Sequence, residues 1–255
     1  MILVFTSHCY FLKLSPLTDS IYNNYLVFSG LGVEFFIMVS GFFSAYTYKQ
    51  QSVKDYLIKK SYRLFPMHWL CLIIGGYLLG IHCGKISILT PISVPLLQSL
   101  IPISGDTNPP SWTISTLFVL YAITPILINN IKKIKHSYYL PVAICLSILS
   151  TIINYFFYSP SNKILFWFLY VSPYYRIITY SIGIFIGLYV TSKERLDVKN
   201  NFIVTLIEAL PIVTILALMF VCHKVPGFWY TLPVSVLICV FSLFLKGGGF
   251  LNCCP

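Results

Sequence analysis

Two residues near the start of the chain could share a proton: His8 and Glu34. Glu34 has no charged neighbour between Asp19 and Lys49, and His8 also lies in an apolar run. A carboxylate is costly in such surroundings unless it has a partner. An imidazole that a carboxylate orients is the arrangement of a general base. The same residues could serve packing alone, with His8 bonded to a neighbouring helix and Glu34 in a structural ion pair.

A second group of residues could bind phosphate. The stretch "KKSYRLFP" (59–66) places Lys59, Lys60 and Arg63 in what would be the first turns of a helix. Lys60 and Arg63 are three residues apart and therefore share a helix face. A helix start together with a guanidinium favours an anion such as phosphate. The alternative is that these charges only anchor a helix at a membrane surface.

A third group consists of polar residues within apolar helices, which could line a cavity or only help helices to pack. Trp112 and Ser115 lie in "PPSWTISTLFVLY" (109–121), and Ser40 lies six residues after Glu34. Arg176 is the strongest of these signals, because an arginine near the end of an apolar helix normally faces a partner or water.

The amino-acid composition indicates whether the helices that position these residues are surrounded by water or by lipid. Of 255 residues, 57% are hydrophobic and 9% are charged, and the mean hydropathy is +0.82. A soluble domain carries about 25% charged residues, so too few polar side chains remain here to cover a water-facing surface. The apolar runs are continuous rather than alternating, which favours helices over a barrel. We therefore predict an all-α integral membrane protein, a polytopic helical bundle in which residues 1–255 form one membrane domain.

Eight apolar segments can be recognised, and most approach the roughly 20 residues that cross ~30 Å of hydrocarbon. They cover residues 1–14, 27–48, 64–82, 112–131, 139–158, 174–192, 203–222 and 228–245. If Met1 is cytoplasmic and each segment crosses once, 12 Lys and Arg side chains lie inside and 5 outside. This bias agrees with the positive-inside rule. The same topology places His8 and Glu34 at the same depth, roughly 9–10 Å below the outer surface of the membrane.

The charge and cysteine patterns argue against several other classes of protein. Because the basic clusters have a topological explanation, the net charge of +10 requires no nucleic-acid partner. The eight cysteines form no C-x-x-C pair, so we expect neither a metal site nor a disulfide framework. We expect no permanently bound cofactor.

Five stretches together resemble the membrane acyltransferase 3 family, which transfers acyl groups, usually acetyl, to sugar hydroxyls. The stretches are His8, "GLGVEFFIMVSGFF" (30–43), "KSYRLFP" (60–66), "NPPSWTISTLFVLY" (108–121) and "SPYYRIITYSIGIFIG" (172–187). Lys60 stands where the family has an arginine, which keeps the charge but loses the bidentate geometry. The family has about ten helices, so the resemblance leads us to expect that this chain, with about eight, lacks the last ones and an arginine that precedes the histidine.

The resemblance implies an integral-membrane O-acyltransferase that takes acetyl from acetyl-coenzyme A. It implies that His8 is the catalytic base or acyl carrier and that Glu34 orients it. Lys59, Lys60 and Arg63 would bind the donor. The residues expected to bind the acceptor or line its cavity are Ser40, Trp112, Ser115 and Arg176.

The acceptor is expected to be a sugar of a cell-envelope or exported polysaccharide, and the protein to be a multi-pass protein of a bacterial cytoplasmic membrane. Two alternatives remain at this point: an inactive remnant of such an enzyme, and a small-molecule transporter with the same buried polar residues. The acceptor sugar, the acyl length and the oligomeric state do not follow from the sequence.

Overall fold

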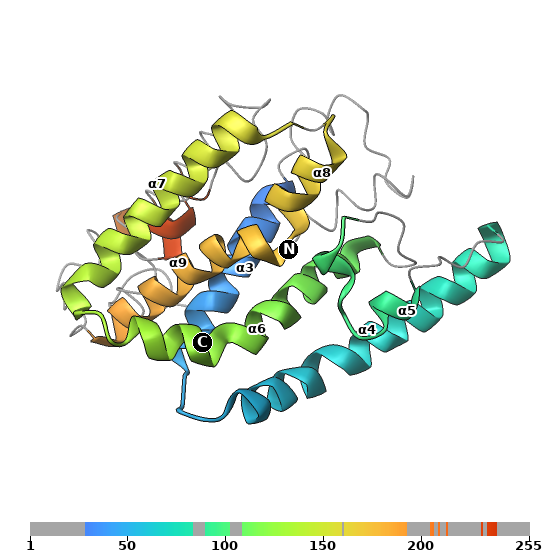
Figure 1. Ribbon diagram of the computed structural model, residues 1–255, viewed down its shortest axis with the longest axis horizontal. Coiled ribbons are helices and arrows are strands. Elements are labelled where there is room, and N and C mark those ends of the chain that lie inside the picture. The colour runs from blue at the N-terminus through green and yellow to red at the C-terminus, as the bar shows by residue number, and fades with distance from the viewer. Residues whose placement is uncertain are drawn as a thin grey trace. The chain divides into compact units, whose positions relative to one another are not determined.

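The computed structural model describes residues 29–83, 90–102, 109–159, 161–192, 205, 206, 209, 213, 231 and 234–238. Within these residues every regular element is a helix, and the α-helices are labelled in Figure 1. The chain divides into two compact units. The first comprises residues 1–47, 134–156 and 178–255, and the second comprises residues 48–133 and 157–177.

Among the described residues, the first unit contains three long helices and one short 3-10 turn. They are α3 (Ser29–Tyr46), η4 (His136–Tyr138), α7 (Tyr139–Phe157) and the larger part of α9 (Pro173–Ser192). The second unit contains two long helices, α4 (Val53–Cys83) and α6 (Trp112–Ile131). Its shorter elements are α5 (Thr90–Ser93), η2 (Gln98–Leu100), η3 (Pro109–Ser111), α8 (Lys163–Phe166) and the π-helical turn η5 (Trp167–Val171).

Helix α7 is polar on its buried side and apolar on its exposed side. The buried residues in its middle are Ala143, Ser147, Ser150 and Asn154. By contrast Ile148, Ile152 and Phe156 are 44%, 48% and 72% exposed. In water this arrangement would be unfavourable, because apolar area is stabilised by burial. In lipid it is the expected one, since small and polar residues mediate helix contacts while apolar side chains face the acyl chains.

Two described helical segments are long and apolar enough to cross a membrane, namely Trp112–Ile131 and His136–Phe157. A third apolar helix, Leu31–Tyr46, is shorter. The prediction of a helical membrane protein therefore agrees with the structure, whereas eight spans are not confirmed. The predicted segment 1–14 lies outside the described residues, as does most of the segments 203–222 and 228–245.

Four of the five long helices that the structure describes, α3, α6, α7 and α9, begin and end within two residues of the predicted bounds. Helix α4 differs, because it begins at Val53 rather than at residue 64. The backbone N–H of Asp55 donates to Ser52 Oγ at 3.1 Å, and Ser52 Oγ donates to Asp55 Oδ2 at 2.7 Å. This Ser-x-x-Asp cap starts the helix about three turns before its apolar part. Lys59, Lys60 and Arg63 therefore lie inside the helix rather than in its first turn.

The segment between the predicted spans 139–158 and 174–192 is largely helical, with α8 and η5 preceding α9. Asn162 caps α8, since its Oδ1 accepts from the backbone N–H groups of Ile164 and Leu165 at 3.1 and 3.2 Å. The chain continues as η5, and Ser172 then caps α9 by accepting from the Tyr174 N–H at 3.1 Å. Pro173 follows as the first residue of α9, where its missing N–H costs no bond.

Candidate active site

Glu34 is buried in the first unit, and its carboxylate is held by two hydroxyl groups. Its exposed fraction is 0%. Its Oε1 accepts hydrogen bonds from Thr179 Oγ1 at 2.8 Å and from Thr231 Oγ1 at 2.7 Å. The three residues are widely separated in the sequence, so the fold itself assembles this group. Hydrogen bonds to a charged acceptor are stronger than neutral ones and offset part of the cost of burial.

Close packing of α3 against α9 brings Thr179 to Glu34. A Cβ atom built on Gly183 would lie 2.0 Å from the carbonyl oxygen of Met38, and one on Gly187 would lie 2.6 Å from that of Phe42. Only residues without a side chain can face a neighbouring backbone at this distance. Glycines spaced four apart on α9 therefore let the two helices touch along their backbones.

The contacts along this helix pair follow one register. Glu34, Met38 and Phe42 of α3 meet Thr179, Gly183 and Gly187 of α9 in the same order. Both rows have a spacing of four residues, which is the spacing of one helix face. The two helices thus run parallel, as they must if segments 27–48 and 174–192 both cross from the outer to the inner side.

A second hydrogen bond fixes the pair further along. Tyr180 Oη donates to Ser44 Oγ at 2.9 Å, and both residues are buried. Gly41 makes room for this contact, since a Cβ atom there would lie 2.1 Å from the Tyr180 carbonyl oxygen. The glycine of the "SGFF" stretch is therefore a packing residue of the contact between α3 and α9.

His8 lies outside the described residues, so its expected contact with Glu34 stays a prediction. Ser40 is on α3, where its Oγ donates to the carbonyl of Phe36 at 2.7 Å. A serine bonded to its own helix in this way is common in apolar helices.

The basic cluster lies on α4 in the second unit and is accessible. Lys59 and Arg63 are exposed, and Lys59 Nζ donates to Gln51 Oε1 at 2.8 Å. Lys60 is half-buried, and its ammonium lies over two tyrosine rings. Its Nζ is 4.4 Å from the ring centroid of Tyr121 and 5.3 Å from that of Tyr56. Burial, and then the charge of Arg63, holds the pKa of Lys60 below its ordinary value.

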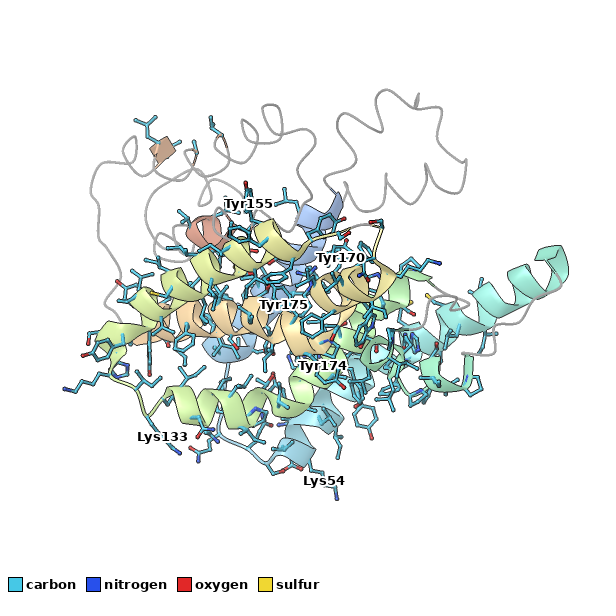
Figure 2. All side chains as sticks on the ribbon, turned by 45° about the horizontal axis from the view of Figure 1, so that its top comes forward. Lys54, Lys133, Tyr155, Tyr170, Tyr174 and Tyr175 are labelled. Atoms are coloured by element: carbon cyan, nitrogen blue, oxygen red, sulfur yellow. The ribbon has the colours of Figure 1, made fainter. Side chains whose placement is uncertain are left out.

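Trp112 and Arg176 converge on one residue that the sequence did not suggest, Tyr170. The ring centroids of Trp112 and Tyr170 are 5.0 Å apart. Arg176 Nε donates to the carbonyl oxygen of Tyr170 at 2.8 Å, and its guanidinium lies 5.1 Å from the centre of the Tyr170 ring. Figure 2 shows Tyr170 on the turn that leads into α9, with Tyr174 one turn further.

The end of η5 explains why these side chains gather there. A helix leaves its last carbonyl groups without helical partners. The Tyr170 carbonyl receives Arg176, and the Val171 carbonyl accepts from Thr116 Oγ1 of α6 at 2.7 Å. Arg176 is completely buried, so this guanidinium is part of the structure as well as a candidate for ligand binding.

Ser115 is bonded to the segment that precedes α6. Its Oγ donates to the Leu96 carbonyl at 2.8 Å, lies 2.8 Å from Ser99 Oγ, and accepts from the Ser99 N–H at 3.1 Å. His68 of α4 bonds the same segment through Nε2 and the Ser93 carbonyl, at 2.7 Å. These bonds give Ser115 a structural task in addition to the acceptor-binding role that we predicted.

Besides Tyr170, the contact residues Thr179, Thr231 and Tyr121 were also missed at the sequence level. Thr179 had a signal, because Thr179, Gly183 and Gly187 repeat at intervals of four and mark one face of α9. Thr231 and Tyr121 had none, since their partners are distant in sequence. Among the described residues, no group of three His, Cys, Asp or Glu side chains could hold a metal ion.

Comparison with known families gives one match. The sequence profile described as an acyltransferase domain, of the acyltransferase 3 family, matches residues 1–252. No curated protein and no solved structure matches the chain. Nearly the whole sequence, including α3, α4, α6 and α9 with the residues described above, lies within the matched region. The chain therefore belongs to the acyltransferase 3 family, and its apolar helices mark it as a membrane acyltransferase.

Proposed function

We propose that this acyltransferase moves an acetyl group from cytoplasmic acetyl-coenzyme A to a hydroxyl of a cell-envelope or exported polysaccharide. Family membership supports acyl transfer rather than the transporter alternative. The observation that carries the site assignment is Glu34, a fully buried carboxylate fixed by Thr179 and Thr231. Burial of an acid between three segments is difficult to explain by packing alone.

The proposed chemistry requires one base and one leaving group. His8 accepts the proton of the acceptor hydroxyl, and the oxygen attacks the thioester carbonyl carbon. The carbon–sulfur bond then breaks, and the coenzyme A thiolate leaves and takes up a proton. In the second route, an imidazole nitrogen of His8 attacks the thioester carbonyl carbon and the coenzyme A thiolate leaves. The acceptor hydroxyl then attacks the acetyl carbon, the carbon–nitrogen bond breaks, and the freed imidazole takes up the hydroxyl proton. In both routes Glu34 fixes the tautomer of the imidazole and stabilises its cation.

Donor and acceptor would bind at different groups of residues. Lys60 and Arg63, with Lys59, would hold the phosphates of coenzyme A on the cytoplasmic side, where exposed cations of α4 are available. Trp112 and Arg176 would contact the sugar near the outer side, with Ser115 and Ser40 as further candidates. The chain would be a multi-pass protein of the cell membrane with a cytoplasmic N-terminus.

The first test is donor binding by the detergent-purified protein, measured as thermal stabilisation by acetyl-coenzyme A. A ligand present at 100 times its dissociation constant stabilises the folded state by about 2.7 kcal/mol. We expect stabilisation of the wild type and its loss in Arg63→Ala, while Lys54→Ala, a charge change two turns earlier on α4, leaves it in place. Equal stabilisation of wild type and Arg63→Ala would exclude the proposed donor site.

The second test is acyl transfer to a polysaccharide acceptor by His8→Ala. We expect transfer to be abolished while membrane insertion is retained, because a general base contributes about 10²–10⁴-fold to the rate. Normal transfer by this variant would contradict the mechanism.

A further inference from the structure

The ammonium group of Lys60 is enclosed by aromatic rings from two helices. Tyr121 comes from α6, and Tyr56 lies one turn before Lys60 on α4. The two rings also contact each other, with centroids 6.3 Å apart. Tyr56 is buried and Tyr121 is 9% exposed. Lys60 Nζ is nearer to Tyr121, at 4.4 Å, than to Tyr56, at 5.3 Å.

The negative face of an aromatic ring attracts a cation within about 6 Å of its centroid. A lysine side chain is otherwise flexible, and ordering it costs conformational entropy when a ligand binds. Rings that hold the ammonium in one place before binding reduce this cost. The charge of Arg63 on the same helix lowers the pKa of Lys60, and α6 itself contains no charged residue.

A lysine needs such help more than an arginine would. The guanidinium of arginine is planar and presents a fixed fork of donors to phosphate, whereas an ammonium is a point charge on a long stem. Lys60 is one of the three cations of the proposed donor site. It is the one whose ammonium group lies over aromatic rings. Lys59 is exposed and bonded to Gln51, and Arg63 is exposed.

We propose that Tyr121, assisted by Tyr56, is a positioning residue for donor binding, which holds the Lys60 ammonium in place to receive a phosphate group of acyl-coenzyme A. The inference rests on the proposed function, because it assumes that Lys60 binds the donor. It assigns to α6 a part in donor binding, although the cations themselves are all on α4.

The experiment is a double-mutant cycle on the dissociation constant of coenzyme A, with Tyr121→Leu and Lys60→Ala in the full-length protein. Cation–π energies correspond to about a three- to tenfold weaker binding for Tyr121→Leu. In the Lys60→Ala background, Tyr121→Leu should have no further effect, because the ring acts through the ammonium. Tyr121→Phe should bind within about twofold of wild type, since it keeps the ring face.

Phe118→Leu is the matched control. Phe118 is on α6, and its ring contacts Phe65 of α4 at 5.2 Å between centroids. Its replacement removes an aromatic contact of the same helix pair without touching a cation, so donor binding should not change. An equal loss in Phe118→Leu and Tyr121→Leu would show a general loosening of the helix pair and would overturn the proposal.

A graded substitution tests the same contact without a change of shape. Phenylalanine analogues with one to three fluorine atoms at position 121 weaken the ring face progressively, so binding should fall stepwise with fluorine number. Constant affinity across this series would overturn the role of Tyr121. If Lys60→Ala weakens binding while the Tyr121 variants do not, only this inference fails. If Lys60→Ala itself has no effect, the donor site of the proposed function fails as well.

Discussion

At the scale of single residues, Glu34 shows how this fold keeps an acid in an apolar helix. Both described hydrogen bonds fall on one oxygen, Oε1, and come from Thr179 and Thr231. Threonine is suited to this task because its hydroxyl donates while its methyl group packs against apolar neighbours. The carboxylate is thereby fixed in one orientation. This is the property required of a group that orients an imidazole.

Glu34→Gln should separate the charge of this residue from its shape. Glutamine retains an oxygen that accepts from both threonines, so folding and membrane insertion should persist. The loss of the negative charge should lower the rate of acyl transfer by at least about 100-fold, a typical contribution of acid–base catalysis. The measurement is the transfer rate at saturating donor. A variant with more than half of the wild-type rate would show that Glu34 serves packing only.

Thr179→Val and Thr179→Ser test the support of that carboxylate. Valine keeps the shape but removes a donor to a buried charged group, which costs about 1.5–3 kcal/mol of stability. Serine keeps the donor and is the matched control, so its thermal midpoint should lie near that of wild type. Equal midpoints for valine and wild type would show that the bond seen here contributes nothing.

The pKa of Lys60 leads to a prediction on pH. Burial, and then Arg63, lowers this pKa from its ordinary value of 10.5. Only the charged form of Lys60 attracts phosphate, so donor affinity should fall as pH rises from neutral through the lowered pKa. Binding should take up protons in that range, because phosphate favours the ammonium. Lys60→Arg should abolish this alkaline loss, since a guanidinium stays charged. An identical pH profile in both proteins would contradict the prediction.

At the scale of elements, the contact between α3 and α9 determines where Thr179 lies. Gly183→Ala would place a methyl group 2.0 Å from the Met38 carbonyl oxygen, so the helices must separate. Overpacking of this kind costs about 1–3 kcal/mol. We expect a lower thermal midpoint together with slower transfer, because separation of the helices also stretches the Thr179–Glu34 bond.

Ser192→Ala is the control for this prediction, since Ser192 is an exposed residue at the end of the same helix and bonds only the Tyr189 carbonyl among described groups. It should leave both the midpoint and the transfer rate unchanged. Wild-type behaviour of Gly183→Ala would show that the two helices can shift without consequence for the site.

The helices also differ in how well the sequence predicted them. Apolar length alone placed α3, α6, α7 and α9, because lipid imposes one hydrophobic thickness on every crossing. It missed the start of α4, since the Ser52–Asp55 cap precedes the apolar part. It missed η5, where the carbonyl groups of Tyr170 and Val171 find their partners on other helices. The contacts of Glu34 could not be predicted, because they depend on which helices become neighbours.

At the scale of the whole molecule, the distribution of charge and the exposure of apolar side chains are both those expected of a protein in a lipid bilayer. Helix α7 exposes isoleucine and phenylalanine while it buries serine and asparagine, which suits lipid and not water. In the second unit, the start of α4 and the end of α6 carry lysines at the same end. Figure 2 shows Lys54 and Lys133 at this edge, both pointing away from the ribbon.

This arrangement predicts the result of cysteine labelling in intact cells. Lys54→Cys and Lys133→Cys, each made in a background without native cysteines, should resist a membrane-impermeant maleimide until the membrane is permeabilised. Lys163→Cys, at the first residue of α8, should react in intact cells, because the positive-inside rule places that segment outside. Labelling of either Lys54→Cys or Lys133→Cys in intact cells would reverse the topology. The cations of α4 would then face away from cytoplasmic coenzyme A, and the proposed donor site would have to be abandoned even if the chemistry at Glu34 were correct.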